Sequence, residues 1–215
     1  MADAARIPCI YALAGANGAG KTSIVGAMFL QEGAEYFDPD GAARRILSAN
    51  PRITQMEANS AAWQEGRRLL ERAIVERCHF AFETTLGGNT ITALLARALS
   101  AGIEVRMWYV GLSSPELHIA RVRARVARGG HDIPATTIRD RYVRSRLNLI
   151  QLLPKLTELR VYDNSENADP HAGGVPEPKL LLHWAGGKVM RCDLVHTPEW
   201  AKPILAAALK TSGVK

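Results

Sequence analysis

The fold of this chain is decided by Gly15-Ala16-Asn17-Gly18-Ala19-Gly20-Lys21-Thr22, a stretch that follows the apolar run Ile7–Ala14. It satisfies the pattern Gly-x-x-x-x-Gly-Lys-Ser/Thr in full. The apolar run predicts a central buried strand, and Lys21–Glu32 predicts a helix. Glycines let a backbone curl so that successive N–H groups point at phosphate oxygens, and the positive end of the following helix adds to the attraction. The stretch therefore predicts a phosphate-binding loop, which we call the phosphate loop.

This loop is expected to bind a nucleoside triphosphate, with ATP and Mg²⁺ as the ligands. Lys21 is expected to neutralise the β- and γ-phosphates, and the Thr22 hydroxyl to coordinate Mg²⁺. The predicted nucleotide-binding residues of this segment are Gly15, Ala16, Asn17, Gly18, Ala19, Gly20, Lys21, Thr22 and Ser23. The alternative is a glycine-rich turn that happens to hold a lysine, and the strand before and helix after the loop disfavour it.

The composition indicates a globular protein. With 215 residues, 47% of them hydrophobic, the chain is long enough to bury one sizeable core. Its three cysteines, Cys9, Cys78 and Cys192, are far apart and show neither metal-ligand spacing nor a disulfide framework. No apolar run is long enough to span a membrane. We therefore expect a cytoplasmic protein with buried thiols and no membrane partner.

Apolar runs that suit strands alternate with segments of helical periodicity. The expected strands are 7–14, 35–37, 79–83, 104–110 and 158–162, and the expected helices are 21–32, one starting at Pro39 with Asp38 as its cap, 51–78 with one break allowed, 89–101, 115–128, 134–153 and 198–209. The pair Gly186-Gly187 separates 179–184 from 188–193 and predicts an edge hairpin. The alternation predicts an α/β three-layer sandwich with a mostly parallel sheet, helices on both faces and a small C-terminal β-hairpin. Together with the phosphate loop, this arrangement resembles the fold of P-loop kinases.

Two units are expected within one domain. Residues 1–165 should form the P-loop kinase core, including an arginine-rich lid at about 115–146. Residues 166–215 should form a C-terminal extension packed on the same domain, entered through a loop rich in proline and glycine at 166–178.

Two carboxylates follow expected strands and are candidates for acceptor chemistry. Asp40 comes just after the second strand and Glu83 ends the third, so both should face the crevice at the carboxyl ends of the strands. A carboxylate there can take a proton from an attacking hydroxyl, hold a substrate hydroxyl or reach a metal through water. The alternative for Asp40 is helix capping, for which Asp38 is the better candidate. Thr84 and Thr85 either join this site or only begin a turn.

A lid is expected from the arginines of 115–128. The net charge is +6, and between Arg121 and Arg146 eight arginines face two acids, Asp132 and Asp140. Arg121 and Arg125 are four residues apart and share a helix face, from which they can stabilise a transferred phosphoryl group. The alternatives are a solvated charged helix face and a phosphodiester partner, although scarce aromatic residues disfavour single-strand stacking. In the glycine corner that follows, His131 either touches a phosphate or caps the turn.

Other classes of phosphate-loop protein are disfavoured by missing signals. No apolar strand ends in the aspartate of a motor-type Mg²⁺ site, and no Asn-Lys-x-Asp guanine signature is present. The pattern therefore favours a kinase over a switch or a motor.

Together the motifs resemble the zeta-toxin family of P-loop kinases, especially its compact zeta-like branch. The matching segments, in the family's order, are Gly15–Thr22, Asp38-Pro39-Asp40, Phe82-Glu83-Thr84-Thr85, Arg121-Val122 with Arg125-Val126, Gly129–Pro134, Ile138–Tyr142 and Tyr162-Asp163-Asn164-Ser165. The combination of Phe-Glu-Thr-Thr with Gly-Gly-His-x-Ile-Pro is the specific part of the resemblance.

The resemblance implies ATP-dependent phosphorylation of a sugar hydroxyl on a UDP-activated amino sugar, UDP-N-acetylglucosamine being the family's substrate. It implies that Asp40 is the general base and that Glu83 holds the substrate. It also implies that the arginines clamp the phosphates and that Asp163-Asn164-Ser165 borders the adenine, which makes Asn164 a nucleotide-binding residue. A protein inhibitor of the antitoxin type is an implied partner.

Two hypotheses result. The first is a small-molecule kinase with catalytic Lys21, Asp40, Arg121 and Arg125, and with a substrate site formed by Asp40, Glu83, Thr84, Thr85 and His131. The second is a nucleotide-dependent ATPase or binding protein that acts on nucleic acid or on a protein partner. Nucleic acid is the less favoured partner.

Overall fold

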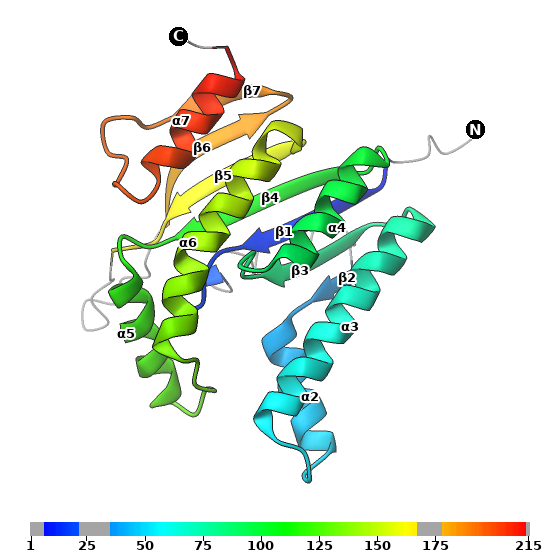
Figure 1. The fold of residues 1–215 in the computed structure, drawn as a ribbon. Helices are drawn as coiled ribbons and strands as arrows, with labels where there is room; N and C mark the ends of the chain where they lie inside the picture. The colour runs from blue at the N-terminus through cyan, green and yellow to red at the C-terminus, as the bar shows by residue number, and fades with distance from the viewer. Residues whose placement is uncertain (1–6, 22–34, 167–177, 214–215) are drawn as a thin grey trace.

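The computed structural model describes residues 7–21, 35–166 and 178–213. Seven strands of these residues form one sheet in the order β2-β3-β1-β4-β5-β6-β7 (Figure 1). The strands are β1 Cys9–Ala14, β2 Glu35–Phe37, β3 Phe80–Thr84, β4 Glu104–Gly111, β5 Glu158–Asp163, β6 Lys179–Ala185 and β7 Lys188–Cys192. The helices are α2 Pro39–Ala49, α3 Gln55–Glu76, α4 Asn89–Ser100, α5 Pro115–Val126, α6 Ala135–Leu152 and α7 Lys202–Thr211, with a 3₁₀ turn, η1, at Leu153–Lys155.

The strand directions confirm the predicted α/β fold with a mostly parallel sheet. The five strands from β2 to β5 are parallel to their neighbours, whereas β6 is antiparallel to β5 and β7 to β6. Because Ala14 pairs with both Thr84 and Tyr109, the carboxyl ends of β1, β3 and β4 lie side by side at one edge. The segment after β1 therefore leaves the sheet between two other strand ends.

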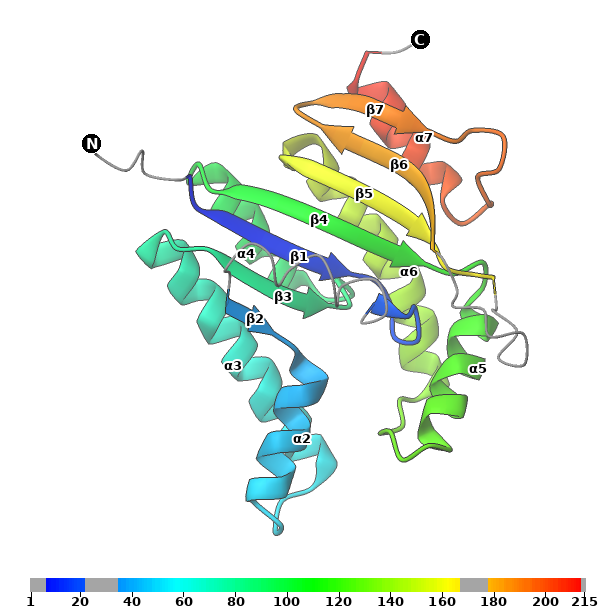
Figure 2. The same cartoon turned by 180° about the vertical axis from the view of Figure 1, so that it is seen from behind.

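The described helices α3, α4, α6 and α7 lie on one face of the sheet, as the two opposite views show (Figures 1 and 2). Helix α5 lies beyond the carboxyl ends of β1 and β4. Helices were predicted on both faces, and the predicted helix 21–32 lies outside the described residues apart from Lys21.

Strand β1 is the centre of the core because all six of its residues are buried. Ile10 and Ala12 face the helices and join a cluster with Leu70, Leu95 and Leu149. The alternate residues of β1 face the other way and pack in a second cluster, whose members are Cys9, Tyr11, Leu13, Ala19, Ala81, Trp108 and Val110. A strand that is buried on both faces explains why Ile7–Ala14 is continuously apolar rather than alternating.

Element boundaries differ from the predictions by a few residues, and local chemistry explains the differences. Asp38 caps α2 as predicted, accepting hydrogen bonds from the backbone N–H groups of Asp40 and Gly41. Helix α3 is unbroken and starts at Gln55, because Thr54 and Glu57 form a reciprocal capping box. Helix α5 ends before the glycine corner, so Arg128 stands in the turn rather than in the helix.

Two further sequence expectations concern thiols and membranes. Cys9 is buried, whereas Cys78 and Cys192 are only half-buried, so the expectation of buried thiols holds for one of the three. None of the helices within the described ranges is both long and apolar enough to cross a membrane.

Replacing Thr54 with alanine should destabilise the protein, because the first turn of α3 loses the hydroxyl that accepts from the Glu57 N–H at 3.2 Å. The expected cost is about 1 kcal/mol, which lowers the melting temperature by about 2–4 °C in a chain of this size. Thermal unfolding followed by circular dichroism measures the effect. Thr54→Ser keeps the hydroxyl and should melt like the wild type; equal melting of wild type and Thr54→Ala would contradict the capping role.

Candidate functional site

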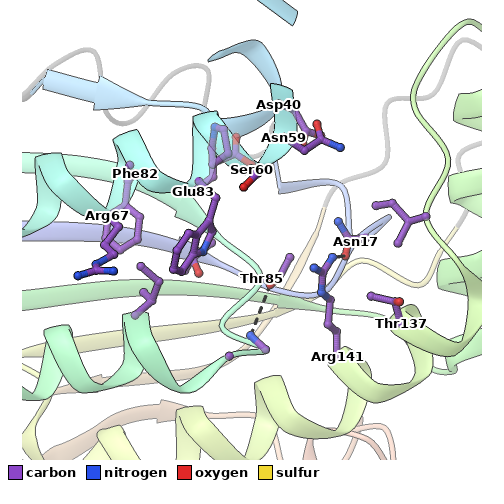
Figure 3. Close-up of a pocket in the computed structure, with 18 of the residues that line it drawn as sticks. Asn17, Asp40, Asn59, Ser60, Arg67, Phe82, Glu83, Thr85, Thr137 and Arg141 are labelled. Atoms are coloured by element: carbon purple, nitrogen blue, oxygen red, sulfur yellow. Dashed lines mark hydrogen bonds between the residues drawn. The ribbon is translucent and has the colours of Figure 1, made fainter. Parts of the chain in front are cut away.

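Two adjoining cavities open at the carboxyl ends of β1 and β3. The first, which we call the loop cavity, has a volume of about 530 Å³ and contains Lys21 and three arginines of the lid, Arg121, Arg125 and Arg128. The second, the α3 cavity, has a volume of about 460 Å³ and is walled by residues of α3 (Figure 3). Both cavities share Asn17, Pro39, Asp40, Glu83, Thr84 and Thr85. A molecule in one cavity would therefore meet a molecule in the other beside the two predicted carboxylates.

The phosphate loop is packed tightly against its neighbours at its glycines. Gly15 has φ +144°, and a Cβ there would lie 2.2 Å from the carbonyl oxygen of Val110. Gly20 has φ +81°, and a Cβ there would lie 2.4 Å from Nδ2 of Asn164. Positive φ and contact with neighbouring groups both require glycine. The described residues of the loop thus form a backbone cradle that fits the predicted phosphate site.

Lys21 is placed where its charge can act on the loop cavity. Its Nζ donates a hydrogen bond to the Gly15 carbonyl oxygen at 2.9 Å, which folds the side chain back over the loop. Burial lowers the pKa of Lys21, while the nearby charges of Glu83 and Asp40 oppose this shift. The two carboxylates are therefore close enough to compensate a buried ammonium group.

The structure brings Asp40 together with the lid. Arg125 Nη1 lies 3.1 Å from Asp40 Oδ2, and Arg125 Nη2 donates to the carbonyl oxygen of His131 at 3.2 Å. Arg121 donates through Nη2 to the carbonyl oxygen of Glu166 at 3.3 Å. Since Asp38 performs the capping of α2, the Asp40 side chain stands in the first helical turn and lines both cavities.

Glu83 is a buried carboxylate at the end of β3, with a partner that the sequence did not reveal. The Tyr36 hydroxyl donates to Glu83 Oε1 at 2.5 Å. Burial raises the pKa of Tyr36, and the hydrogen bond to Glu83 raises it further, so the phenol stays protonated and donating. Tyr36 comes from the short edge strand β2, and β2 pairs with β3 in parallel. This pairing places the two side chains together.

The two threonines after Glu83 both form turns and line the site. Thr84 Oγ1 accepts from the Leu86 N–H at 3.0 Å, and Thr85 Oγ1 accepts from the Gly87 N–H at 3.4 Å. Both residues line both cavities. The sequence left open whether these threonines join the site or begin a turn, and the structure shows that they do both.

Three other predicted residues have distinct positions. Asn164 is buried behind the phosphate loop, where its Nδ2 donates to the Ala19 carbonyl oxygen at 2.9 Å. His131 lines the α3 cavity, and its backbone carbonyl receives the hydrogen bond from Arg125. Thr22 and Ser23, predicted to bind metal and nucleotide, lie outside the described residues.

Arg141 belongs to the matching segment Ile138–Tyr142 but was not predicted as a site residue, and α6 directs it into the site (Figure 3). Its Nη1 donates to Asn17 Oδ1 at 2.7 Å. A signal was present, because Arg141 lies three residues after buried Ile138 and four before buried Ser145, and so belongs to the inward face of the helix.

The α3 wall was also missed. Asn59, Ser60, Trp63 and Arg67 line the cavity from α3, and Figure 3 shows Arg67 on the side away from Asn17 and Arg141. The spacing of three and four residues could have indicated a shared face. Nothing in the sequence indicates that this face lines a cavity instead of facing bulk solvent.

Comparison with known proteins places the chain in a family. The zeta toxin family model matches residues 2–172. An uncharacterized protein of Haemophilus influenzae is 33% identical over 129 residues, which are 60% of this chain and 88% of that protein.

Two solved structures share the fold. The crystal structure of AvrRxo1-ORF1:-ORF2 with ATP is similar with a TM-score of 0.65 and 16% identity over 94% of this chain, which spans 63% of that longer chain. The PezAT chromosomal toxin-antitoxin system of Streptococcus pneumoniae is similar with a TM-score of 0.57 and 15% identity, covering 97% of this chain and 87% of that one. Fold, phosphate loop and family match agree: this chain belongs to the zeta toxin family of P-loop kinases.

Proposed function

We propose that this chain is an ATP-dependent kinase that phosphorylates a sugar hydroxyl of a nucleotide sugar resembling UDP-N-acetylglucosamine. One observation carries the proposal: Asp40 lines both cavities and is ion-paired with Arg125 of the lid at 3.1 Å. A base for the acceptor and a cation for the transferred group thus lie at the junction of two binding spaces.

The loop cavity fits the triphosphate of ATP. Glycines at positions where a Cβ would collide let the loop backbone face the cavity, so that N–H groups of residues 16–18 and 20 can hold phosphate oxygens, while the Gly15 and Ala19 N–H groups donate to backbone carbonyl oxygens. Lys21, Arg121, Arg125 and Arg128 surround the same space with positive charge. Thr22 is the proposed Mg²⁺ ligand, and Mg²⁺, when bound, would supply charge neutralisation on the phosphates. The ATP in the AvrRxo1-ORF1:-ORF2 structure supports the choice of nucleotide.

On the acceptor side, Asp40 would accept the proton of the attacking hydroxyl as general base. Arg125 holds that carboxylate where the two cavities meet. The Asp38 side chain fixes the first turn of α2 by accepting hydrogen bonds from the backbone N–H groups of Asp40 and Gly41. Glu83, aligned by the Tyr36 hydroxyl, would accept a neighbouring hydroxyl of the sugar. Thr84, Thr85 and His131 complete the proposed acceptor contacts.

The walls of the α3 cavity support a nucleotide sugar as acceptor. Trp63, Phe37 and Phe82 give it apolar surface on which a flat ring can pack, and Asn59, Ser60 and Arg67 give hydrogen-bond donors for polar or anionic groups. A volume of about 460 Å³ falls within the range of small-molecule sites.

The binding-protein alternative is less well supported. Arg121, Arg125 and Arg128 line the loop cavity, so this arginine cluster faces the site. On α6, Arg139 and Arg144 are paired with Glu116 and Asp140. A protein partner of the antitoxin type remains part of the proposal, and the likeness to the PezAT toxin-antitoxin structure supports it.

Asp40→Asn should retain ATP binding and lose phosphoryl transfer by roughly a hundredfold or more, because the amide cannot take the hydroxyl proton. Transfer of ³²P from labelled ATP to a panel of nucleotide sugars, resolved by mass, measures turnover, and equilibrium dialysis measures ATP affinity. Asp140→Asn removes an exposed acid paired with Arg144 and should leave turnover unchanged. Unchanged turnover in Asp40→Asn would rule out the base assignment.

Trp63 should report acceptor binding. It is 42% exposed, whereas the other three tryptophans, Trp108, Trp184 and Trp200, are at most 7% exposed, so collisional quenching by acrylamide is dominated by Trp63. An acceptor in the α3 cavity should reduce the quenching constant by about half or more, since it covers the indole. Trp63→Phe should abolish the effect. A nucleotide sugar that is phosphorylated yet leaves quenching unchanged would show that the acceptor binds elsewhere.

A further inference from the structure

Strands β6 and β7 and helix α7 lie beyond residue 172, where the match to the family model ends. We propose that Trp200, in the turn before α7, is a positioning residue for the phosphate loop and acts on it through two chains of contacts. The proposal rests on the proposed function only in taking this loop as the nucleotide site.

The first chain runs through the end of β5. Trp200 Nε1 donates to Asp163 Oδ1 at 3.0 Å, and the same carboxylate oxygen accepts from the Ser165 hydroxyl at 2.5 Å. Ser165 Oγ in turn accepts from the backbone N–H of Ser113 at 2.8 Å. The indole therefore fixes the carboxylate that holds the segment 163–165 in its turn.

Asn164, at the middle of that turn, is the contact to the loop. Its backbone N–H donates to the Gly111 carbonyl oxygen at 3.0 Å, and its side chain donates to the Ala19 carbonyl oxygen at 2.9 Å. It also occupies the space beside Gly20. A shift of segment 163–165 would therefore move the group that supports residues 19 and 20.

The Trp200 ring also fixes the neighbouring end of β4. A Cβ on Gly111 would lie 2.3 Å from the indole, and Trp200 is only 3% exposed. Gly111 is the residue whose carbonyl holds the Asn164 backbone. Trp200 thus contacts Gly111, which holds the Asn164 backbone, through its six-membered ring, and Asp163, the residue before Asn164, through Nε1.

The second chain runs through α6 and α5. The Trp200 carbonyl oxygen accepts from Arg146 Nη1 at 3.2 Å, and the Arg146 guanidinium lies over the Tyr142 ring at 4.2 Å from its centroid. Tyr142 meets the His118 ring edge-on with centroids 5.6 Å apart. His118 Nδ1 donates to the Asn17 carbonyl oxygen at 2.7 Å. Burial lowers the pKa of His118 to about 4, so this donor is a neutral imidazole at neutral pH.

The two chains hold different parts of one loop. One ends at Ala19 and the other at Asn17, and the Tyr142 hydroxyl links them by donating to the Ser113 carbonyl oxygen at 3.2 Å. A residue from the C-terminal segment thereby restrains both ends of the stretch 17–19. The loop needs such restraint because its N–H groups act only when they are pre-aligned on the phosphates.

The test compares Trp200→Phe with Trp184→Phe by hydrogen exchange of the peptide that covers residues 15–20. Trp184 is the matched control, because it is also buried in the C-terminal segment and donates to the Leu156 carbonyl oxygen at 3.4 Å, away from the loop. We expect loop exchange to become roughly three- to tenfold faster in Trp200→Phe and to stay at the wild-type rate in Trp184→Phe. Equal loop exchange in the two variants would overturn the proposal, even if both melt at lower temperature.

Nucleotide affinity gives a second readout. Trp200→Phe should raise the dissociation constant of ATP roughly three- to tenfold in the wild-type background and have little effect in an Asn164→Ala background, because both changes interrupt one route. Full additivity of the two changes would contradict the proposed route. If the wild-type protein binds no ATP, the proposed function is contradicted. The hydrogen-exchange comparison would still decide whether Trp200 positions the phosphate loop.

Arg146→Gln provides a test if Trp200→Phe does not fold. It interrupts only the second chain and leaves the indole in place beside Gly111. We expect faster exchange at residues 17 and 18 than in wild type. Exchange there at the wild-type rate would remove the second chain from the proposal.

Discussion

The close packing of other segments against the glycines of the phosphate loop is the constraint on which the rest of the structure depends. Three groups from distant parts of the chain close on this loop: the Val110 carbonyl at the end of β4, the α5 backbone at His118, and the Asn164 amide after β5. Each stands where a Cβ on the loop would have to be. The loop therefore owes its shape to its neighbours as much as to its own glycines, and β1, β4, α5 and β5 must all be correctly placed for it to form.

The same arrangement explains how the loop cavity and the α3 cavity come to share a boundary. Parallel strands bring Asp40 and Glu83 to the edge of the sheet where the loop leaves β1. The lid then adds Arg125 from the opposite side, at a sequence separation of 85 residues from Asp40. An exposed pair of this kind contributes little to stability. The pair matters for position rather than for stability, because it holds the Asp40 carboxylate between the two cavities.

Much of the fold could be predicted from the sequence, because local sequence patterns determine where its strands, helices and turns begin and end. The apolar run before Gly15, the proline and aspartate at the start of α2 and the glycine pair between β6 and β7 each act within a few residues. Candidate site residues with a motif, such as Lys21 and Asp40, could be named for the same reason. The contacts of Tyr36, Arg141 and Trp200 could not be predicted, because each side chain has a partner that only tertiary packing brings close. These partners are Glu83, Asn17 and Asp163, at sequence separations of 47, 124 and 37 residues.

The pairing of β1 has a consequence for how the protein acquires its site. The first strand joins β3 through Ile10 and Phe80, and β4 through Cys9 and Glu104, so the central pairings of the sheet connect residues 70 and 95 positions apart. Loop-closure entropy makes such pairings slow to form, and they come late compared with local helices. The segment 15–20 cannot adopt its cradle until they are complete. A newly made chain is therefore expected to bind nucleotide at full affinity only after β5 and Asn164 have been synthesised and docked, which ties tight binding to the completion of folding.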